Sequence, residues 1–214
     1  MLDKTKEAAT TVDAAKKVTL VKPADATGEI AEIFEDIRRV KGENFLTPNW
    51  GFFALDVDLL RHWWGLAKRL QTAAGKSALP KPLLNSISLV CSAEVNCVRC
   101  INNHQTHLIE HFGWTEADVV EILNFENSTK VDDMTKAVLR FARKVAFAEG
   151  TTEADFQELR RHGVSDVGVA EIVSMAMLES GMARHAVGVA QFEDCDAWPL
   201  ENLPSAAYAG AVKK

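Results

Sequence analysis

Residues 96–104 hold two cysteines and one histidine in the run Asn96-Cys97-Val98-Arg99-Cys100-Ile101-Asn102-Asn103-His104. A C-x-x-C pair either cycles between dithiol and disulfide or holds a metal ion, and both uses require thiolates. If the run is helical, Cys97, Cys100 and His104 stand at i, i+3 and i+7 and share one face. An imidazole one turn from the thiols is well placed to move protons at neutral pH. The run therefore predicts a helix that carries either redox or metal chemistry.

The helix predicted from this run covers residues 97 to about 112. Asn96 is of a residue type that caps helix starts, and Gly113 is of the type that ends helices. Because a helix turns about 100° per residue, His107 and His111 fall within an arc of roughly 80° that also contains the motif residues. Three of the six histidines in the chain therefore share a face with both motif cysteines.

Helical periodicity continues on both sides of this run. Apolar residues recur at helical spacing, and Ser, Thr or Asp stands at several of the expected starts. We find no convincing alternating strand pattern, and Gly181 is expected to interrupt or end the last helix. Further helices are predicted over roughly 27–41, 56–70, 80 onward, 115–123, 132–146, 152–163 and 165–181. The sequence thus predicts an all-α chain of seven to nine helices.

The two ends of the chain differ from this helical region in composition. Residues 1–21 are polar, rich in Ala, Lys and Thr and without clear periodicity, so we expect a flexible N-terminal arm. The helical domain is predicted to cover 22–192. Residues 193–214 contain two prolines and several alanines, and we expect an irregular C-terminal tail that packs on another surface such as a neighbouring subunit.

Composition excludes several classes of protein. The 214 residues carry a formal net charge of −6, whereas a nucleic-acid-binding protein usually has a basic face. No segment is long and apolar enough to cross a membrane, and the charged N-terminus has no apolar core of a signal peptide. We therefore expect a cytoplasmic protein with no nucleic-acid or membrane partner. In that reducing compartment a C-x-x-C pair is more often catalytic or metal-binding than structural.

Three interpretations of the motif remain open on the residues alone. In the redox interpretation, Cys97 at the helix start is stabilised as a thiolate by free backbone N–H groups, its partner closes a disulfide, and His104 relays protons. A metal site would use the two thiolates with His104 and His107, but a structural zinc site draws its second ligand pair from a separate segment, and none is evident. The third interpretation is a buried helix face with small cysteines and no chemistry.

On these residues the chain resembles the AhpD-like alkylhydroperoxidase and carboxymuconolactone decarboxylase family, and especially its peroxidase-related branch. That family carries a glutamate, eleven intervening residues, C-x-x-C, three residues and a histidine. The matching core here runs from Ser92 through the cysteines to His104. Helices over roughly 22–192 match in type.

The resemblance implies an AhpD-like helical bundle that assembles into homo-oligomers, often trimers or hexamers. It also implies reduction of a small-molecule hydroperoxide with no bound cofactor or metal, and regeneration by a thiol or disulfide reductant that the sequence does not identify. By this carry-over, Cys97 and Cys100 form the redox pair and His104 is the proton relay. Helix position favours Cys97 as the more thiolate-like sulfur, whereas burial in the family pattern favours Cys100 as the peroxide-reactive one.

One departure from the family pattern affects the predicted relay. Twelve positions before Cys97, where the family has glutamate, this chain has Asn85. An amide can orient His104 by a hydrogen bond but cannot accept a proton. Loss of such a base typically costs about 10²–10⁴-fold in rate. Arg99 between the cysteines is a second departure, because some members of the family carry histidine there. The charge of an arginine so close would lower the pKa of a thiol and partly compensate for the missing base.

The predicted function is therefore a thiol-dependent peroxidase, weakened by Asn85, with Cys97, Cys100, His104 and Asn85 as its site residues. Two other classes remain as alternatives. A metal-binding or structural oligomer without turnover would account for the missing glutamate. A lyase of the decarboxylase branch is the second alternative, although the resemblance implies that this branch does not depend on the C-x-x-C pair.

Overall fold

The computed structural model describes residues 18–73 and 76–189, and every regular element within these ranges is helical. The prediction of an all-α fold with seven to nine helices is confirmed for this part of the chain. The helices are α1 (Gly28–Lys41), α2 (Pro48–Phe53), α3 (Val57–Gln71), α4 (Lys81–Glu94), α5 (Val98–Phe112), α6 (Glu116–Leu123), α7 (Asp133–Phe147), α8 (Glu153–Arg161) and α9 (Asp166–Val189). Short 3-10 turns cover Pro23–Asp25 and Glu43–Phe45.

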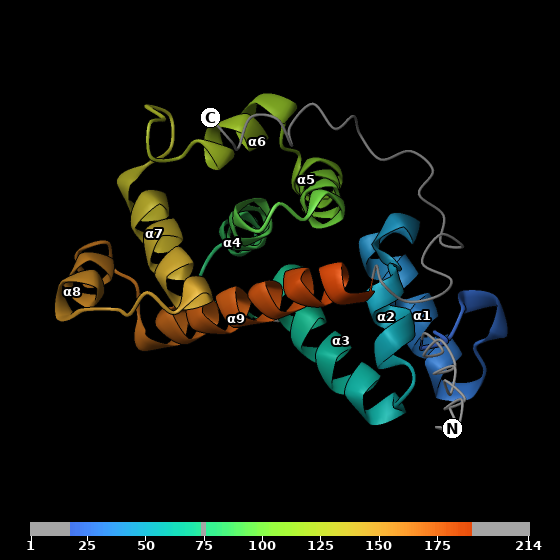
Figure 1. Cartoon of the computed structure of the whole chain (residues 1–214). Helices are drawn as coiled ribbons and strands as arrows, with labels where there is room; N and C mark the ends of the chain where they lie inside the picture. Colours follow the sequence, from blue (N-terminus) through green and yellow to red (C-terminus); the bar gives the residue numbers. More distant parts are fainter. Residues whose placement is uncertain (1–17, 74–75, 190–214) are drawn as a thin grey trace, which may run out of the picture.

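Helix α4 is the centre of the fold. It packs against α5, α6, α7 and α9, and Figure 1 shows it seen nearly end-on among them. Every residue from 83 to 93 is buried, which is the pattern of a helix covered on all sides. Its serines fit this position because they are small, and the Ser86 hydroxyl donates to the Pro82 carbonyl within the same helix. Burial on every face allows α4 to support side chains from several neighbours at once.

A second group of helices, α1, α2 and α3, packs beside α9 (Figure 1). Its centre is Trp50, which is 1% exposed and donates its indole N–H to the Phe45 carbonyl at 3.0 Å. The sequence did not predict α2 as a separate helix. This helix is only six residues long and starts at Pro48, so it is too short to display a period. The Asn49 amide donates to the Met182 carbonyl at 3.1 Å and joins α2 to α9.

Two predicted helix boundaries were wrong. Gly181 does not end α9, which continues to Val189. A glycine inside a helix costs about 1 kcal/mol, and here the packing of α9 against α2, α4 and α7 outweighs that cost. Asn96 is not the cap of α5 either, because it adopts a left-handed φ of 55° and Cys97 takes the N-cap position. Asparagine tolerates this conformation better than most residues.

Several predicted starts and stops are confirmed. Thr115 forms a capping box with Asp118 at the start of α6. Asp132 caps α7 by accepting from the Thr135 N–H at 2.9 Å. Gly113 ends α5 with a left-handed φ of 71°. These local signals could be read from the sequence because each depends on residues within one helical turn.

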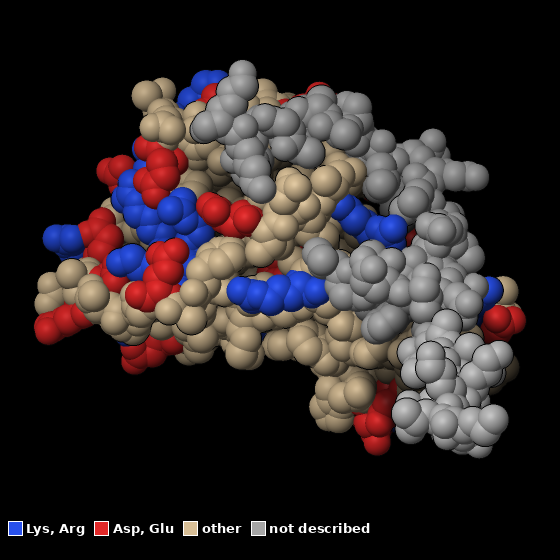
Figure 2. All heavy atoms as spheres, in the orientation of Figure 1, with Lys and Arg blue, Asp and Glu red and all other residues tan. Residues whose placement is uncertain are grey.

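The predicted arm and tail are largely outside the described residues. Of the arm, the structure describes residues 18–21, where Leu20 is buried and the Val21 N–H donates to the Gly51 carbonyl. The predicted tail, 193–214, lies wholly outside the described residues. Among the helices that the structure describes, none has the length and apolar character needed to cross a membrane. On the face shown in Figure 2, acidic and basic side chains are mixed rather than gathered in a basic patch.

Candidate active site

The two motif cysteines lie at the start of α5 and are joined by a disulfide, with their Cα atoms 5.3 Å apart. Cys97 is the N-cap residue and Cys100 lies in the first turn. Both are buried, at 6% and 8% exposure, and Ala183 of α9 packs against them. The backbone N–H of Cys97 donates to the Ser92 carbonyl at 3.0 Å, which fixes the start of α5 against the end of α4.

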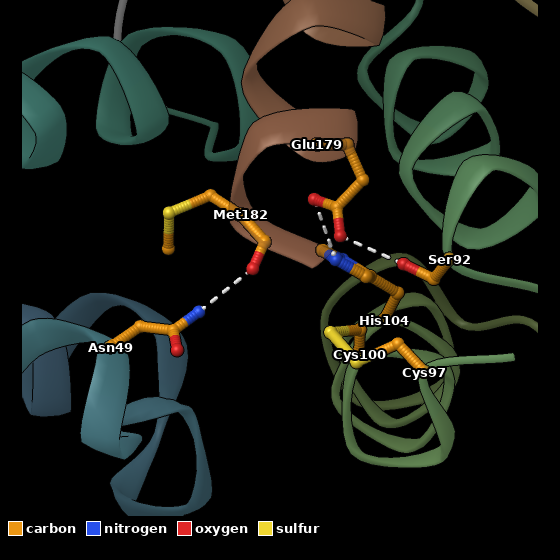
Figure 3. Close-up of a disulfide and its surroundings, with 7 residues drawn as sticks. All are labelled: Asn49, Ser92, Cys97, Cys100, His104, Glu179 and Met182. Carbon is orange, nitrogen blue, oxygen red and sulfur yellow. Dashed lines mark hydrogen bonds and ion pairs between the residues drawn. A yellow bond between two sulfur atoms is a disulfide. The ribbon is translucent and has the colours of Figure 1, made fainter. Parts of the chain in front are cut away.

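His104 extends from the next turn of α5 towards α9 (Figure 3). Its Nε2 atom lies 3.0 Å from Oε2 of Glu179, and these side chains are 4% and 2% exposed. The other carboxylate oxygen of Glu179 accepts from the Ser92 hydroxyl at 2.7 Å. Three helices therefore meet at this point, because Ser92 belongs to α4, His104 to α5 and Glu179 to α9.

The hydrogen bond to Glu179 selects one form of the His104 ring. An ionised carboxylate only accepts hydrogen bonds, so Nε2 must carry the proton. In neutral His104 this leaves the lone pair on Nδ1, which has no hydrogen-bond partner within the described part of the chain. The arrangement has the geometry of a proton relay: Nδ1 can take up a proton while Glu179 stabilises the resulting imidazolium.

A small cavity of about 30 Å³ lies beside these groups. Space of this size holds about one water molecule. The cavity brings Cys100, His104 and Glu179 to one surface, whereas Cys97 does not line it. The remaining lining residues are Phe45, Thr47, Asn49, Trp50, Ala67, Gln71, Arg99, Asn103, Leu178, Met182 and Ala186.

Asn85 is not joined to His104 by any hydrogen bond that the described structure contains. Its amide nitrogen donates to the carbonyls of Gln71 and Lys81, each at 2.9 Å, and ties α4 to the end of α3. The structure therefore brings together three of the four predicted site residues, Cys97, Cys100 and His104. The carboxylate that contacts His104 comes from Glu179 instead.

Sequence reasoning missed Glu179 because it lies far along the chain, in a different helix. One signal was present in the sequence. Glu179 stands at helical spacing from Ile172, Met175 and Ala183, so it is a lone carboxylate on an otherwise apolar stripe. A charged residue on such a stripe is buried only when it has a polar partner.

The two other histidines on the predicted face of α5 do not join the cysteines. The Nε2 atom of His107 lies 3.1 Å from the Gln71 carbonyl oxygen. Burial, followed by the charges of Lys41 and His111, lowers the pKa of His107 to about 2, so it stays neutral at physiological pH. His111 is exposed. In the residues that the structure describes, no group of three or more His, Cys, Asp or Glu side chains could hold a metal ion.

Two side chains close to the motif in the sequence, Cys91 and Glu94, lie outside the cavity that Cys100 lines. Burial raises the pKa of the free thiol of Cys91 to about 12, which leaves that thiol protonated and inert. Glu94 lies 3.5 Å from the guanidinium of Arg143, in an ion pair that joins α4 to α7. Neither residue lines the cavity beside Cys100.

Comparison with known proteins identifies the fold. No family model and no curated protein matches the chain. Among solved structures, the AhpD-core peroxidase-related protein from Ralstonia eutropha JMP134 matches with a TM-score of 0.67 and 20% identity, over 80% of this chain and 88% of that chain. A peroxidase-related protein from Silicibacter sp. TM1040 matches with a TM-score of 0.68 and 21% identity, over 85% and 93%.

A third solved structure is that of a cysteine-to-alanine variant of the debrominase Bmp8, in complex with 2,3,4-tribromopyrrole. It matches with a TM-score of 0.68 and 21% identity, over 84% of this chain and 93% of that chain. Likeness at this level of identity establishes the arrangement of the helices. The chain therefore has the AhpD-like helical fold of the peroxidase-related proteins.

Proposed function

We propose that this protein is a thiol-dependent peroxidase that reduces a hydroperoxide through a dithiol–disulfide cycle of Cys97 and Cys100. One observation carries the proposal: Cys100, which forms a disulfide with Cys97, shares a cavity surface with a buried histidine that is hydrogen-bonded to a carboxylate. A dithiol supplies two electrons, and the His104–Glu179 pair supplies a route for the protons. Both are needed to split an O–O bond without a metal.

Cys100 is the proposed peroxide-reactive sulfur because it lines the cavity together with His104. Its thiol gives its proton to Nδ1 of His104, and the thiolate attacks the distal oxygen of the hydroperoxide. The O–O bond breaks, the alkoxide takes the proton from His104, and an alcohol leaves. Cys100 is then a sulfenic acid, in which sulfur has lost two electrons.

Cys97 is the proposed resolving thiol. Its position at the N-cap of α5 favours the thiolate form. The Cys97 thiolate attacks the sulfenic sulfur, the S–S bond forms, and hydroxide leaves as water after taking up the proton that Cys97 released. An external dithiol then reduces the disulfide by thiol–disulfide exchange and is itself oxidised. The sum is one hydroperoxide and one dithiol converted into alcohol, water and a disulfide.

Glu179 takes the role that the family glutamate would have and that Asn85 cannot fill. Its carboxylate accepts the Nε2 hydrogen of His104 and stabilises the imidazolium that forms after proton uptake. The Ser92 hydroxyl holds the other carboxylate oxygen in place. On this proposal the activity is not weakened by Asn85, because the base is supplied from α9.

The direct test follows thiols and peroxide together. Reduced protein is mixed with cumene hydroperoxide, and free thiols and remaining peroxide are counted over time. The proposal requires loss of two thiols per peroxide consumed. In Cys97→Ser, the sulfenic acid on Cys100 should persist and react with dimedone, whereas Cys100→Ser should give no such adduct on Cys97. Unchanged thiols with no peroxide consumption would reject the proposal.

A second candidate is reductive dehalogenation, favoured by the likeness to the debrominase Bmp8 bound to 2,3,4-tribromopyrrole. The same dithiol could donate two electrons to a carbon–bromine bond, giving C–H, bromide, a proton and the disulfide. Incubation of the reduced protein with 2,3,4-tribromopyrrole and measurement of released bromide separates the two functions. Bromide release matched by thiol loss, with no peroxide consumption, would replace the first proposal by the second.

A further inference from the structure

Lys41 is a buried lysine for which the proposed cycle has no use. It is the last residue of α1, where a lysine side chain usually extends into solvent, yet it is only 4% exposed. Its ammonium nitrogen has no hydrogen-bond partner within the described part of the chain. It lies 4.3 Å from the centre of the Phe45 ring, in a cation–π contact. A buried amine without a hydrogen-bond partner requires an explanation.

The contacts of Phe45 place Lys41 next to the candidate active site. The rings of Phe45 and His104 are 6.1 Å apart, edge to face, and Phe45 lines the same cavity as Cys100 and Glu179. The charge of Lys41 interacts with Glu179 of α9 and with His107 of α5. Of the other basic residues on α1, Arg38 bonds to Glu43 at 3.1 Å and Arg39 bonds to Asp36, both at exposed positions.

Glu179 needs a compensating positive charge. Its side chain is 2% exposed, and the described residues that contact its carboxylate are the Ser92 hydroxyl and the His104 ring. Burial disfavours the ionised form of a carboxylate, and a nearby opposite charge favours that form. Burial lowers the pKa of Lys41 well below its usual value, and the negative charge of Glu179 opposes that lowering. The charged forms of Lys41 and Glu179 therefore favour each other.

We propose that Lys41 is a positioning residue of the proton relay, which acts as the buried counter-charge that keeps Glu179 ionised and His104 able to accept a proton. This inference rests on the proposed function, because the relay is the one assigned to the peroxidase cycle. Lys41 does not touch the reacting atoms. It acts through the charge of Glu179.

The test is the pH dependence of thiol ionisation in Lys41→Met, which keeps the length of the side chain and removes the charge. The reduced protein is alkylated with iodoacetamide from pH 5 to 10, and the apparent pKa of the reactive thiol is read from the rates. Loss of a nearby positive charge should raise this pKa by about one pH unit. Lys41→Arg should lie closer to wild type, and Lys130→Met, which removes an exposed lysine that does not line the cavity, should match wild type.

A double variant separates action through Glu179 from a direct effect on the cysteines. In a Glu179→Gln background, Lys41→Met should shift the thiol pKa much less than it does in wild type. An undiminished shift, or no shift in the single variant, would overturn the inference. Alkylation is measured without peroxide, so failure of peroxide reduction by wild-type protein rejects the proposed function and leaves this readout intact.

A second measurement does not depend on whether Lys41→Met folds. NMR titration of lysine side chains in wild type and Glu179→Gln reports the pKa of Lys41 itself. Removal of the carboxylate charge should lower that pKa, because Glu179 raises it in the wild-type protein. An unchanged Lys41 pKa in Glu179→Gln would show that the two groups are not coupled and would overturn the inference.

Discussion

Helix α9 carries two buried glutamates about two turns apart, and they have opposite surroundings. Glu171, at 5% exposure, receives hydrogen bonds from the Ser77 hydroxyl, two backbone N–H groups and Arg69, at 2.8 to 3.1 Å. Glu179, at 2% exposure, has hydrogen-bond contacts within the described residues only with the Ser92 hydroxyl and the His104 ring. Both residues are buried glutamates on the same helix, so they differ in the groups that bond to their carboxylates.

The donors around Glu171 favour its ionised form. Burial opposes ionisation, but the hydrogen bonds from Ser77, Leu79, Arg69 and Ala78 outweigh it and lower the pKa of Glu171. These partners hold the segment before α4 against the start of α9. Glu179 has an imidazole as its partner, and it lies beside the cavity that Cys100 lines. We therefore expect Glu171 to stabilise the fold and Glu179 to serve the proposed chemistry.

The largest expected effect comes from breaking the redox half of the site. Cys100→Ser should abolish peroxide turnover, because no sulfenic acid can form at the cavity and no disulfide can close. Consumption of cumene hydroperoxide in the presence of excess dithiothreitol measures this, with the uncatalysed rate subtracted. Cys91→Ser is the matched control, since that thiol is buried and outside the cavity. Turnover by Cys100→Ser above background would remove Cys100 from the mechanism.

The comparison of the two glutamates is tested directly by Glu179→Gln and Glu171→Gln. Glu179→Gln removes the acceptor behind His104 and should lower the rate of peroxide reduction by about 10²-fold, at the lower end for general acid–base catalysis. Glu171→Gln should leave the rate within about twofold, because its contacts do not line the cavity. Stopped-flow measurement of thiol oxidation gives both rates. Equal losses in the two variants would mean that Glu179 is only another structural carboxylate.

The sequence predicted the local half of this site and not the distant half. Cys97, Cys100 and His104 are neighbours because of helical spacing alone, so their proximity could be read from residue numbers. The approach of Glu179 depends on how α9 packs against α4 and α5, which no short pattern encodes. Asn85 was predicted at the site by its position relative to the motif. The structure has its amide bonded to the carbonyls of Gln71 and Lys81.

The helices were predictable in proportion to their length and their caps. Helices α6 and α7 begin at side chains that satisfy the first backbone N–H groups, and these signals lie within four residues. Helix α2 offered no such pattern over its six residues. The continuation of α9 through Gly181 is a tertiary effect, because the local preference of glycine is to end a helix.

A smaller effect is expected from Ser92→Ala, which weakens the hold on Glu179 without removing its charge. The hydroxyl donates to the carboxylate at 2.7 Å, and a hydrogen bond to a charged group contributes about 1.5–3 kcal/mol. We expect the rate of peroxide reduction to fall about tenfold, which corresponds to about 1.4 kcal/mol. Ser86→Ala on the same helix is the control, since its hydroxyl bonds only within α4. A rate equal to wild type in Ser92→Ala would show that Glu179 needs no second anchor.

The smallest effect on turnover, that of Glu171→Gln, should be accompanied by a change in acid stability. Because the pKa of Glu171 is lowered in the folded protein, its contribution to stability is fully present above the unfolded value of about 4.3 and is lost as pH falls through the lower folded value. Glu171→Gln should therefore reduce the free energy of unfolding at pH 7 by about 2 kcal/mol. This difference from wild type should shrink below pH 4, where the wild-type carboxylate also becomes neutral. Urea denaturation at pH 7, 4 and 3 measures the difference, and a gap that stays constant with pH would mean that Glu171 stabilises α9 by its shape rather than by its charge.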